Sequence, residues 1–125
     1  MCLDSLSYEA REIDVLHGVM ILHRKYLLPV CRKAMPIDMA GWQYARKELL
    51  SVRRGYDRYY SGFHLYESLE DAIAYGHKTA NGDFLVITHE VQDIIVQGID
   101  CRKHVTVVGA RKPLWIAYDS RKDRR

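Results

Sequence analysis

Cysteine is scarce in this sequence and is not arranged for chemistry. The three cysteines, Cys2, Cys31 and Cys101, are odd in number and lie far apart. No C-x-x-C pair is present, so the spacing used by zinc sites and by thiol redox motifs is missing. We therefore expect reduced thiols, as in cytosolic proteins.

Long hydrophobic runs are missing as well. The longest apolar stretch, around residues 15 to 22, is interrupted by His17 and Gly18 and is too short to span a bilayer. Residues 1 to 14 carry four acids and one base without an apolar core, which differs from a signal peptide. The sequence predicts a soluble, cytoplasmic protein that makes no use of a membrane.

Complete catalytic and metal-binding motifs are also lacking. The six histidines are scattered, with no H-E-x-x-H or similar ligand spacing, so we expect no metal site. Ser61, Ser68 and Thr88 lack the surroundings of a nucleophile elbow, which gives hydrolase chemistry no support. If their strands are neighbours, His64, Tyr66 and His89 would line one face of a sheet.

The chain does have enough apolar material for one core. Its 125 residues are 48% hydrophobic, which predicts a single domain over residues 1 to 119 followed by a charged tail at 120 to 125. The net charge of +3 conceals four blocks, which carry −3 (residues 1 to 22), +6 (23 to 60), −6 (61 to 100) and +6 (101 to 125). These blocks either pair within the fold or present charged faces to partners.

Residues 62 to 76 change period in a way that predicts a strand followed by a helix. Residues 63 to 66 alternate apolar and polar side chains, as in a strand with one buried face. From Ser68 onward the apolar spacing becomes helical, and Ser68 is placed to cap the helix by accepting from the backbone of Asp71. We expect Gly76 to end this helix in a left-handed conformation.

The sequence predicts mainly strands in the rest of the chain. Strands are expected at residues 15 to 23, 84 to 91, 93 to 97, 104 to 109 and 114 to 118, with a kink near 92 and 93 and a polar turn at 98 to 103. Residues 4 to 13 suit a short helix or an arm, residues 35 to 38 a turn, and residues 40 to 50 either a helix or an irregular loop. The fold class is therefore α+β, with about five mostly antiparallel strands and one or two packed helices.

One segment combines residues that recognise ligands. Guanidinium groups, which bind phosphates, alternate here with rings on which a base stacks, and the segment leads into the strand that contains His64. The predicted binding residues are Arg53, Arg54, Tyr56, Arg58, Tyr59, Tyr60 and His64. The alternative is a solvated loop whose tyrosines cover a sheet edge.

Two resemblances add to this. The residues Gly62-Phe63-His64, Ser68-Leu69-Glu70-Asp71-Ala72, Glu90-Val91, Asp93-Ile94-Ile95-Val96 and Val105-Thr106-Val107-Val108, together with the opening Met1-Cys2-Leu3, resemble small bacteriophage and prophage proteins. That resemblance covers residues 60 to 116 best and implies a phage-associated context inside a bacterial host cell, where small proteins often counter host defence.

The second resemblance is to ADP-ribosyltransferase-like domains. His17-Gly18 followed by the 62 to 72 segment is similar in order to their first two strand motifs. In that reading His17 and Tyr66 would hold NAD and Glu90 would be catalytic, although the residues that usually follow the histidine and glycine are absent.

These observations predict a non-enzymatic accessory protein without a cofactor. It would bind a bacterial defence component in the manner of an anti-CRISPR protein, or sequester a nucleotide signal. The alternatives are the NAD-using enzyme and a nucleic-acid-binding protein, whose affinity would fall steeply with salt. The sequence also leaves a homo-oligomer open.

Overall fold

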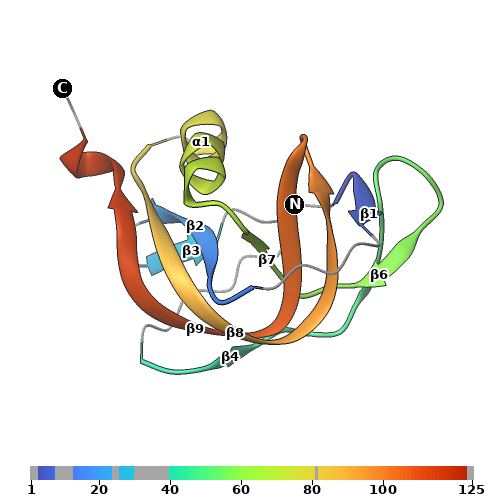
Figure 1. Cartoon of the computed structure of the whole chain (residues 1–125). Coiled ribbons are helices and arrows are strands. Elements are labelled where there is room, and N and C mark those ends of the chain that lie inside the picture. Colours follow the sequence, from blue (N-terminus) through green and yellow to red (C-terminus); the bar gives the residue numbers. More distant parts are fainter. Residues whose placement is uncertain (1–2, 8–12, 24–25, 30–39, 81, 124–125) are drawn as a thin grey trace.

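The computed structural model describes residues 3–7, 13–23, 26–29, 40–80 and 82–123 (Figure 1). One α-helix, one short 3-10 helix and nine strands occur in these ranges. In chain order they are β1 (Ser5–Ser7), β2 (Leu16–His23), β3 (Tyr26–Pro29), β4 (Gln43–Tyr44), β5 (Leu49–Ser51), β6 (Arg58–Tyr60), β7 (Phe63–Tyr66), α1 (Leu69–Thr79), β8 (Phe84–Asp100), β9 (Lys103–Asp119) and η1 (Ser120–Lys122).

A long hairpin of β8 and β9 forms the frame of the fold. Its two strands pair from Leu85 with Asp119 to Asp100 with Lys103, and three register shifts interrupt the ladder. Figure 1 shows both strands strongly bent, with α1 over the concave side. Register shifts of this kind allow a sheet to bend, so the hairpin curves instead of lying flat.

The other strands complete a nearly closed sheet around this hairpin. β2 pairs with the first half of β8, and β7 pairs with β9 and also meets β2 at His17 and Tyr66. β8 pairs with β2, β2 with β7, β7 with β9, and β9 again with β8. β1, β3 and β4 extend this antiparallel sheet, and β5 and β6 form a separate two-stranded sheet.

The prediction of a mostly antiparallel sheet with a packed helix is confirmed, but the count of about five strands is wrong. The strands predicted at 84 to 91 and 93 to 97 are one strand, as are those at 104 to 109 and 114 to 118. Of the ranges for which a helix is one of two predicted alternatives, residues 4 to 13 contain β1, and residues 40 to 50 contain β4 and the start of β5. Strands of two or three residues are too short to show a period, which is why the sequence did not indicate them.

The predicted strand and helix at residues 63 to 79 are present, with one correction. The Ser68 side chain accepts from the backbone nitrogen of Asp71 at 3.3 Å, as expected of an N-cap. The helix does not end at Gly76 but continues to Thr79, with Ala80 as its C-cap. Gly76 is buried within the helix, where an added Cβ would overlap the ring of Phe84.

The core is divided between the two faces of the sheet. The larger cluster lies beneath α1 and includes Val19, Tyr66, Ala72, Phe84 and Val86. Leu85 and Ile87, which alternate with these β8 residues, pack with Met20 in a different cluster. Both faces of β8 are thus buried in its first half, which explains its continuous apolar sequence.

The charged residues after β9 have structure of their own. Asp119 accepts from the backbone nitrogen of Arg121 at 3.0 Å, and the Tyr118 hydroxyl donates to Asp123 at 2.8 Å. The turn predicted at residues 35 to 38 lies outside the described residues. Within the described ranges, no helix has both the length and the apolar character needed to cross a bilayer.

Replacing Gly76 with alanine tests the contact between α1 and β8. Alanine normally stabilises a helix interior relative to glycine by about 1 kcal/mol. Because the new methyl group would overlap Phe84, we expect Gly76→Ala to lower the free energy of unfolding instead, by roughly 1–3 kcal/mol. Urea denaturation measures the sign.

The exposed helix position Ala74 supplies the control. Ala74→Gly should show only the propensity cost of about 1 kcal/mol. A more stable Gly76→Ala variant would contradict the packing described here.

Candidate binding site

The segment predicted to bind a ligand is the tip and second strand of the β5–β6 hairpin. β5 pairs with β6 through Leu49 with Tyr60 and Ser51 with Arg58. Residues 52 to 57 form the tip, closed by a hydrogen bond of 3.1 Å from the Val52 nitrogen to the Asp57 oxygen. Figure 1 shows this hairpin projecting beside β1 and the turn of the long β8–β9 hairpin.

Arg53 ties this tip to the rest of the protein. Its Nη1 atom lies 3.6 Å from Oδ1 of the buried Asp100 and 3.8 Å from Oδ1 of Asp4. The backbone nitrogens of Arg53 and Arg54 donate to the carbonyls of Leu3 and Asp4 at 2.9 and 3.0 Å. The charge of Arg53 therefore neutralises acids of the protein itself, so this residue has a structural role.

The same acids form the one cluster of potential metal ligands found among the described residues. Oxygens of Asp4 and Asp100 and the sulfur of Cys101 lie within 4.8 Å of one another. Burial raises the pKa of Asp100, whereas the nearby Arg53 acts in the opposite direction. Because the guanidinium already supplies the positive charge there, the arrangement is explained as an ion pair.

The buried Tyr59 and the partly buried His64 are linked in a chain of hydrogen bonds. The Tyr59 hydroxyl accepts from the Leu3 nitrogen at 3.0 Å and lies 3.0 Å from His64 Nε2. His64 Nδ1 lies 3.1 Å from the Gly62 oxygen, so a proton on Nδ1 satisfies the whole chain. Burial lowers the pKa of His64 to about 4. The neutral ring therefore has a structural role as a hydrogen-bonding group.

The other predicted residues of the segment are exposed. Arg58 and Tyr60 flank the buried Tyr59 on β6 and therefore point away from the core on one face. Tyr60 is 57% exposed and Tyr56, at the tip, is fully exposed. The predicted segment thus divides into an inner part that holds the hairpin and an outer part that is available to a partner.

Neighbouring residues that the sequence analysis missed enlarge the exposed part. Tyr44 on β4 is 68% exposed, and Arg46 and Lys47 follow it in an exposed segment. Residues 44 to 60 contain five bases and two acids, a net charge of +3. We call the following residues the basic–aromatic surface: Tyr44, Arg46, Lys47, Arg54, Tyr56, Arg58 and Tyr60.

A cavity opens within this surface. It has a volume of about 290 Å³ and lies where β4, the end of β6 and the bends of β8 and β9 meet. Its lining residues are Tyr44, Ala45, Lys47, Tyr60, Ser61, Asp93, Ile95 and Gly109. The sequence could not predict this cavity, because residues 40 to 50 suited a helix or an irregular loop and β4 reaches the cavity only by pairing with β9.

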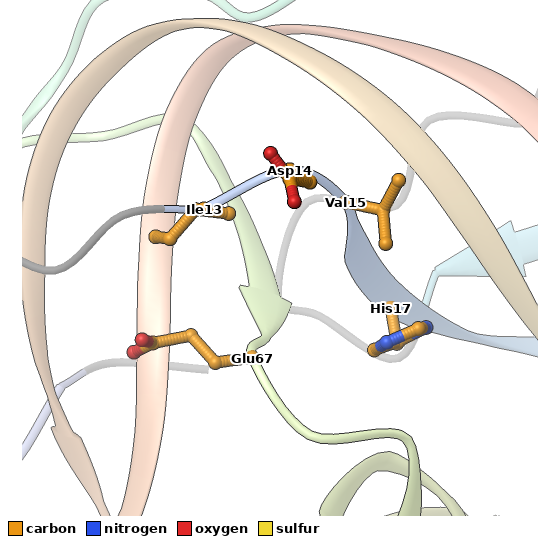
Figure 2. Close-up of a pocket in the computed structure, with 5 residues that line it drawn as sticks. All are labelled: Ile13, Asp14, Val15, His17 and Glu67. Atoms are coloured by element: carbon orange, nitrogen blue, oxygen red, sulfur yellow. The ribbon is translucent and has the colours of Figure 1, made fainter.

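A different cavity, of about 260 Å³, holds His17. Figure 2 shows His17 on β2 and Glu67 after β7 on opposite sides of it, with Ile13, Asp14 and Val15 completing the lining. His17 Nδ1 lies 3.0 Å from the Thr88 hydroxyl, and burial lowers the pKa of the histidine. The histidine therefore faces carboxylates while remaining biased toward its neutral form.

Of the three residues that the ADP-ribosyltransferase resemblance implies, His17 lines that cavity, whereas Tyr66 and Glu90 do not. Tyr66 is opposite His17 in the sheet, but its ring packs in the main core at 5.3 Å from that of Tyr75. Burial raises the pKa of the Tyr66 hydroxyl above its ordinary range. Glu90 is exposed, pairs across the strands with Lys112, and is not among the residues lining the cavity.

His89 belongs to the opposite face of the sheet. It is fully buried, and among the described residues neither ring nitrogen has a hydrogen-bond partner. Burial and the positive charge of Arg111 lower its pKa to about 3. An added Cβ at Gly18 would meet both His89 and Leu65, whereas Tyr66 points the other way into the main core. The expectation that His64, Tyr66 and His89 share one face is therefore wrong.

Comparison of the chain with protein-family models, with curated proteins and with solved structures gives no match. The candidate site consequently depends on the geometry of this chain alone. Of the two cavities, the one in the basic–aromatic surface combines exposed aromatic rings with positive charge.

The partly buried position of His64 predicts a loss of stability in acid. Its pKa is about 4 in the fold, against an ordinary value of 6.5. The unfolded chain therefore binds the extra proton first as the pH falls below 6.5, and stability declines until the folded pKa is reached. At about 1.4 kcal/mol per pKa unit, His64 contributes roughly 3 kcal/mol to this loss.

Urea denaturation between pH 7 and pH 4 measures the effect. A folded His64→Gln variant should show a shallower decline than the parent, whereas the exposed His104→Gln should leave the slope unchanged. Equal slopes for all three proteins would contradict a His64 that is held neutral in the folded protein.

Proposed function

We propose that this protein is a non-enzymatic binding protein that holds a phosphate-bearing ligand on its basic–aromatic surface. The observation that carries the proposal is the division of the β5–β6 hairpin. Arg53 and Tyr59 attach the hairpin to the rest of the protein, while Arg54, Tyr56 and Arg58 remain exposed beside them. Because these contacts hold the hairpin in place, less conformational freedom is lost when the exposed residues bind a ligand.

The chemistry of these side chains favours a nucleotide or a single-stranded nucleic acid. A guanidinium group donates two parallel hydrogen bonds to phosphate oxygens, and tyrosine rings provide faces on which bases stack. The net charge of +3 over residues 44 to 60 attracts anions to the same region.

The phage resemblance gives this binding a biological setting. In that setting the protein acts inside a bacterial host as an accessory protein that inhibits a defence component, by sequestering its nucleotide signal. Arginine and tyrosine also dominate protein interfaces, so direct binding to a host defence protein, as in an anti-CRISPR protein, is the competing outcome of the test below.

Paired substitutions separate these outcomes. We expect Arg54→Ala/Arg58→Ala to weaken the binding of nucleoside monophosphates and short single-stranded oligonucleotides by tenfold or more, because phosphate contacts are lost. Affinity of the parent should also fall as salt is raised. Isothermal titration calorimetry measures both effects after circular dichroism shows that the variants are folded.

The control is a double variant with the same loss of charge elsewhere. Lys78→Ala/Lys122→Ala removes two exposed cations from α1 and η1 and should bind like the parent. If no nucleotide binds and a host protein is captured instead, with Tyr56→Ala/Tyr60→Ala the costlier change, the ligand is a protein and the proposal fails.

A further inference from the structure

The cavity within the basic–aromatic surface has a feature that the hairpin alone does not explain, namely the exposed carboxylate of Asp93, which has no partner among the described residues. We propose that this cavity is a nucleobase pocket in which Asp93 selects a base with two adjacent N–H donors, the guanine edge. The inference rests on the proposed function and specifies which ligand the surface prefers.

The aromatic walls of the cavity are held by backbone contacts. Tyr44 is fixed by pairing with Ala110, and the nitrogen of the next residue, Ala45, donates to the Gly109 oxygen at 2.8 Å. Beside Tyr60, the hydroxyl of Ser61 donates to the Arg46 oxygen at 2.9 Å. The two exposed tyrosines, 16 residues apart in sequence, therefore border one preformed cavity.

Asp93 is aimed into this cavity by an unusual backbone. It has a left-handed φ of 60° in the middle of β8, one residue before the register shift between Ile94 and Val96 in the ladder with β9. An added Cβ at Gly109 would overlap its carboxylate, so the side chain is folded against this glycine, which also lines the cavity. Such a conformation is costly outside a turn and often serves to redirect a side chain at a functional site.

The Asp93 carboxylate is available to a ligand. Within the part of the chain that the structure describes, it takes part in no hydrogen bond or ion pair. An ionised carboxylate is purely an acceptor, with two oxygens that can receive two parallel hydrogen bonds. Asp93 thus offers an acceptor pair next to two aromatic rings.

Guanine matches this arrangement better than the other bases. Its N1–H and N2–H groups are adjacent donors, whereas adenine and cytosine present one exocyclic amino group beside a ring acceptor and uracil presents a single N–H. A guanine base stacked on the tyrosines would place both donors on Asp93, and Lys47 at the same cavity would face the phosphate. A free guanine nucleotide and a guanine in a single strand share this chemistry.

Replacing the Asp93 carboxylate with an amide of similar shape tests the pocket. Calorimetry with GMP, AMP, CMP and UMP should give the tightest binding for GMP, by tenfold or more. Asp93→Asn should abolish this preference while leaving AMP binding within twofold of the parent, because asparagine tolerates the left-handed backbone but replaces one acceptor oxygen with a donor. Tyr44→Ala/Tyr60→Ala should weaken all four nucleotides.

Glu90→Gln is the matched control, because it neutralises an exposed acid on the same strand outside the cavity and should retain the preference for GMP. A parallel titration with a guanine-containing and a guanine-free oligonucleotide distinguishes a free nucleotide from a strand as the tighter ligand.

The outcomes separate this inference from the proposed function. Equal binding of all four nucleotides, unchanged in Asp93→Asn but lost in Arg54→Ala/Arg58→Ala, overturns the pocket and leaves the phosphate-binding surface intact. A preference for GMP that survives Asp93→Asn also overturns it. Failure of every nucleotide and oligonucleotide to bind overturns both.

Discussion

The ladder between β8 and β9 is the interaction on which the rest of this structure depends. Each strand has 17 residues, and β1, β2, β4 and β7 all pair with one or the other. The hairpin closes through Cys101 and Arg102, which both have left-handed φ values, as a type I′ turn requires. The Asp4 carboxylate accepts from the Cys101 nitrogen at 2.8 Å, so the N-terminal segment stabilises this strained turn.

That turn is also where the binding surface is attached. Arg53 reaches Asp4 and the buried Asp100 from the β5–β6 hairpin, connecting three segments that are distant in the sequence. Removing one member of a fully buried ion pair typically costs about 3–5 kcal/mol, and the half-exposed Arg53 gives this pair a smaller contribution. The strongly charged segment is therefore partly structural, and its position follows from the fold of the long hairpin.

The bends of the same hairpin create the cavity. A straight β8 would direct Asp93 by simple alternation, but the left-handed residue and the adjacent register shift turn its side chain toward Gly109 and β4. The irregularity that bends the sheet around its core thus also exposes an acceptor on the basic–aromatic surface.

Local patterns in the sequence determined much of the second half of the fold. The alternation at residues 63 to 66 and the cap at Ser68 identify β7 and α1, since both signals act over a few residues. The combination of arginine and tyrosine at residues 53 to 60 likewise indicated an unusual segment. Composition alone, however, could not separate Arg53 and Tyr59, which bind the protein itself, from Arg54 and Tyr56, which are exposed.

Only the tertiary structure decided the remaining features, because they depend on contacts between distant residues. Gly76 has the sequence signature of a helix end, yet the ring of Phe84 beside it explains the glycine and the helix continues. Tyr44 and Asp93 carry no shared motif and meet only because β4 pairs with β9 at the bend of β8. The sequence by itself thus determined the elements whose signals are local. The long-range pairing of the β8–β9 hairpin decided which side chains form the core, which have structural roles at the binding surface, and which line the cavity.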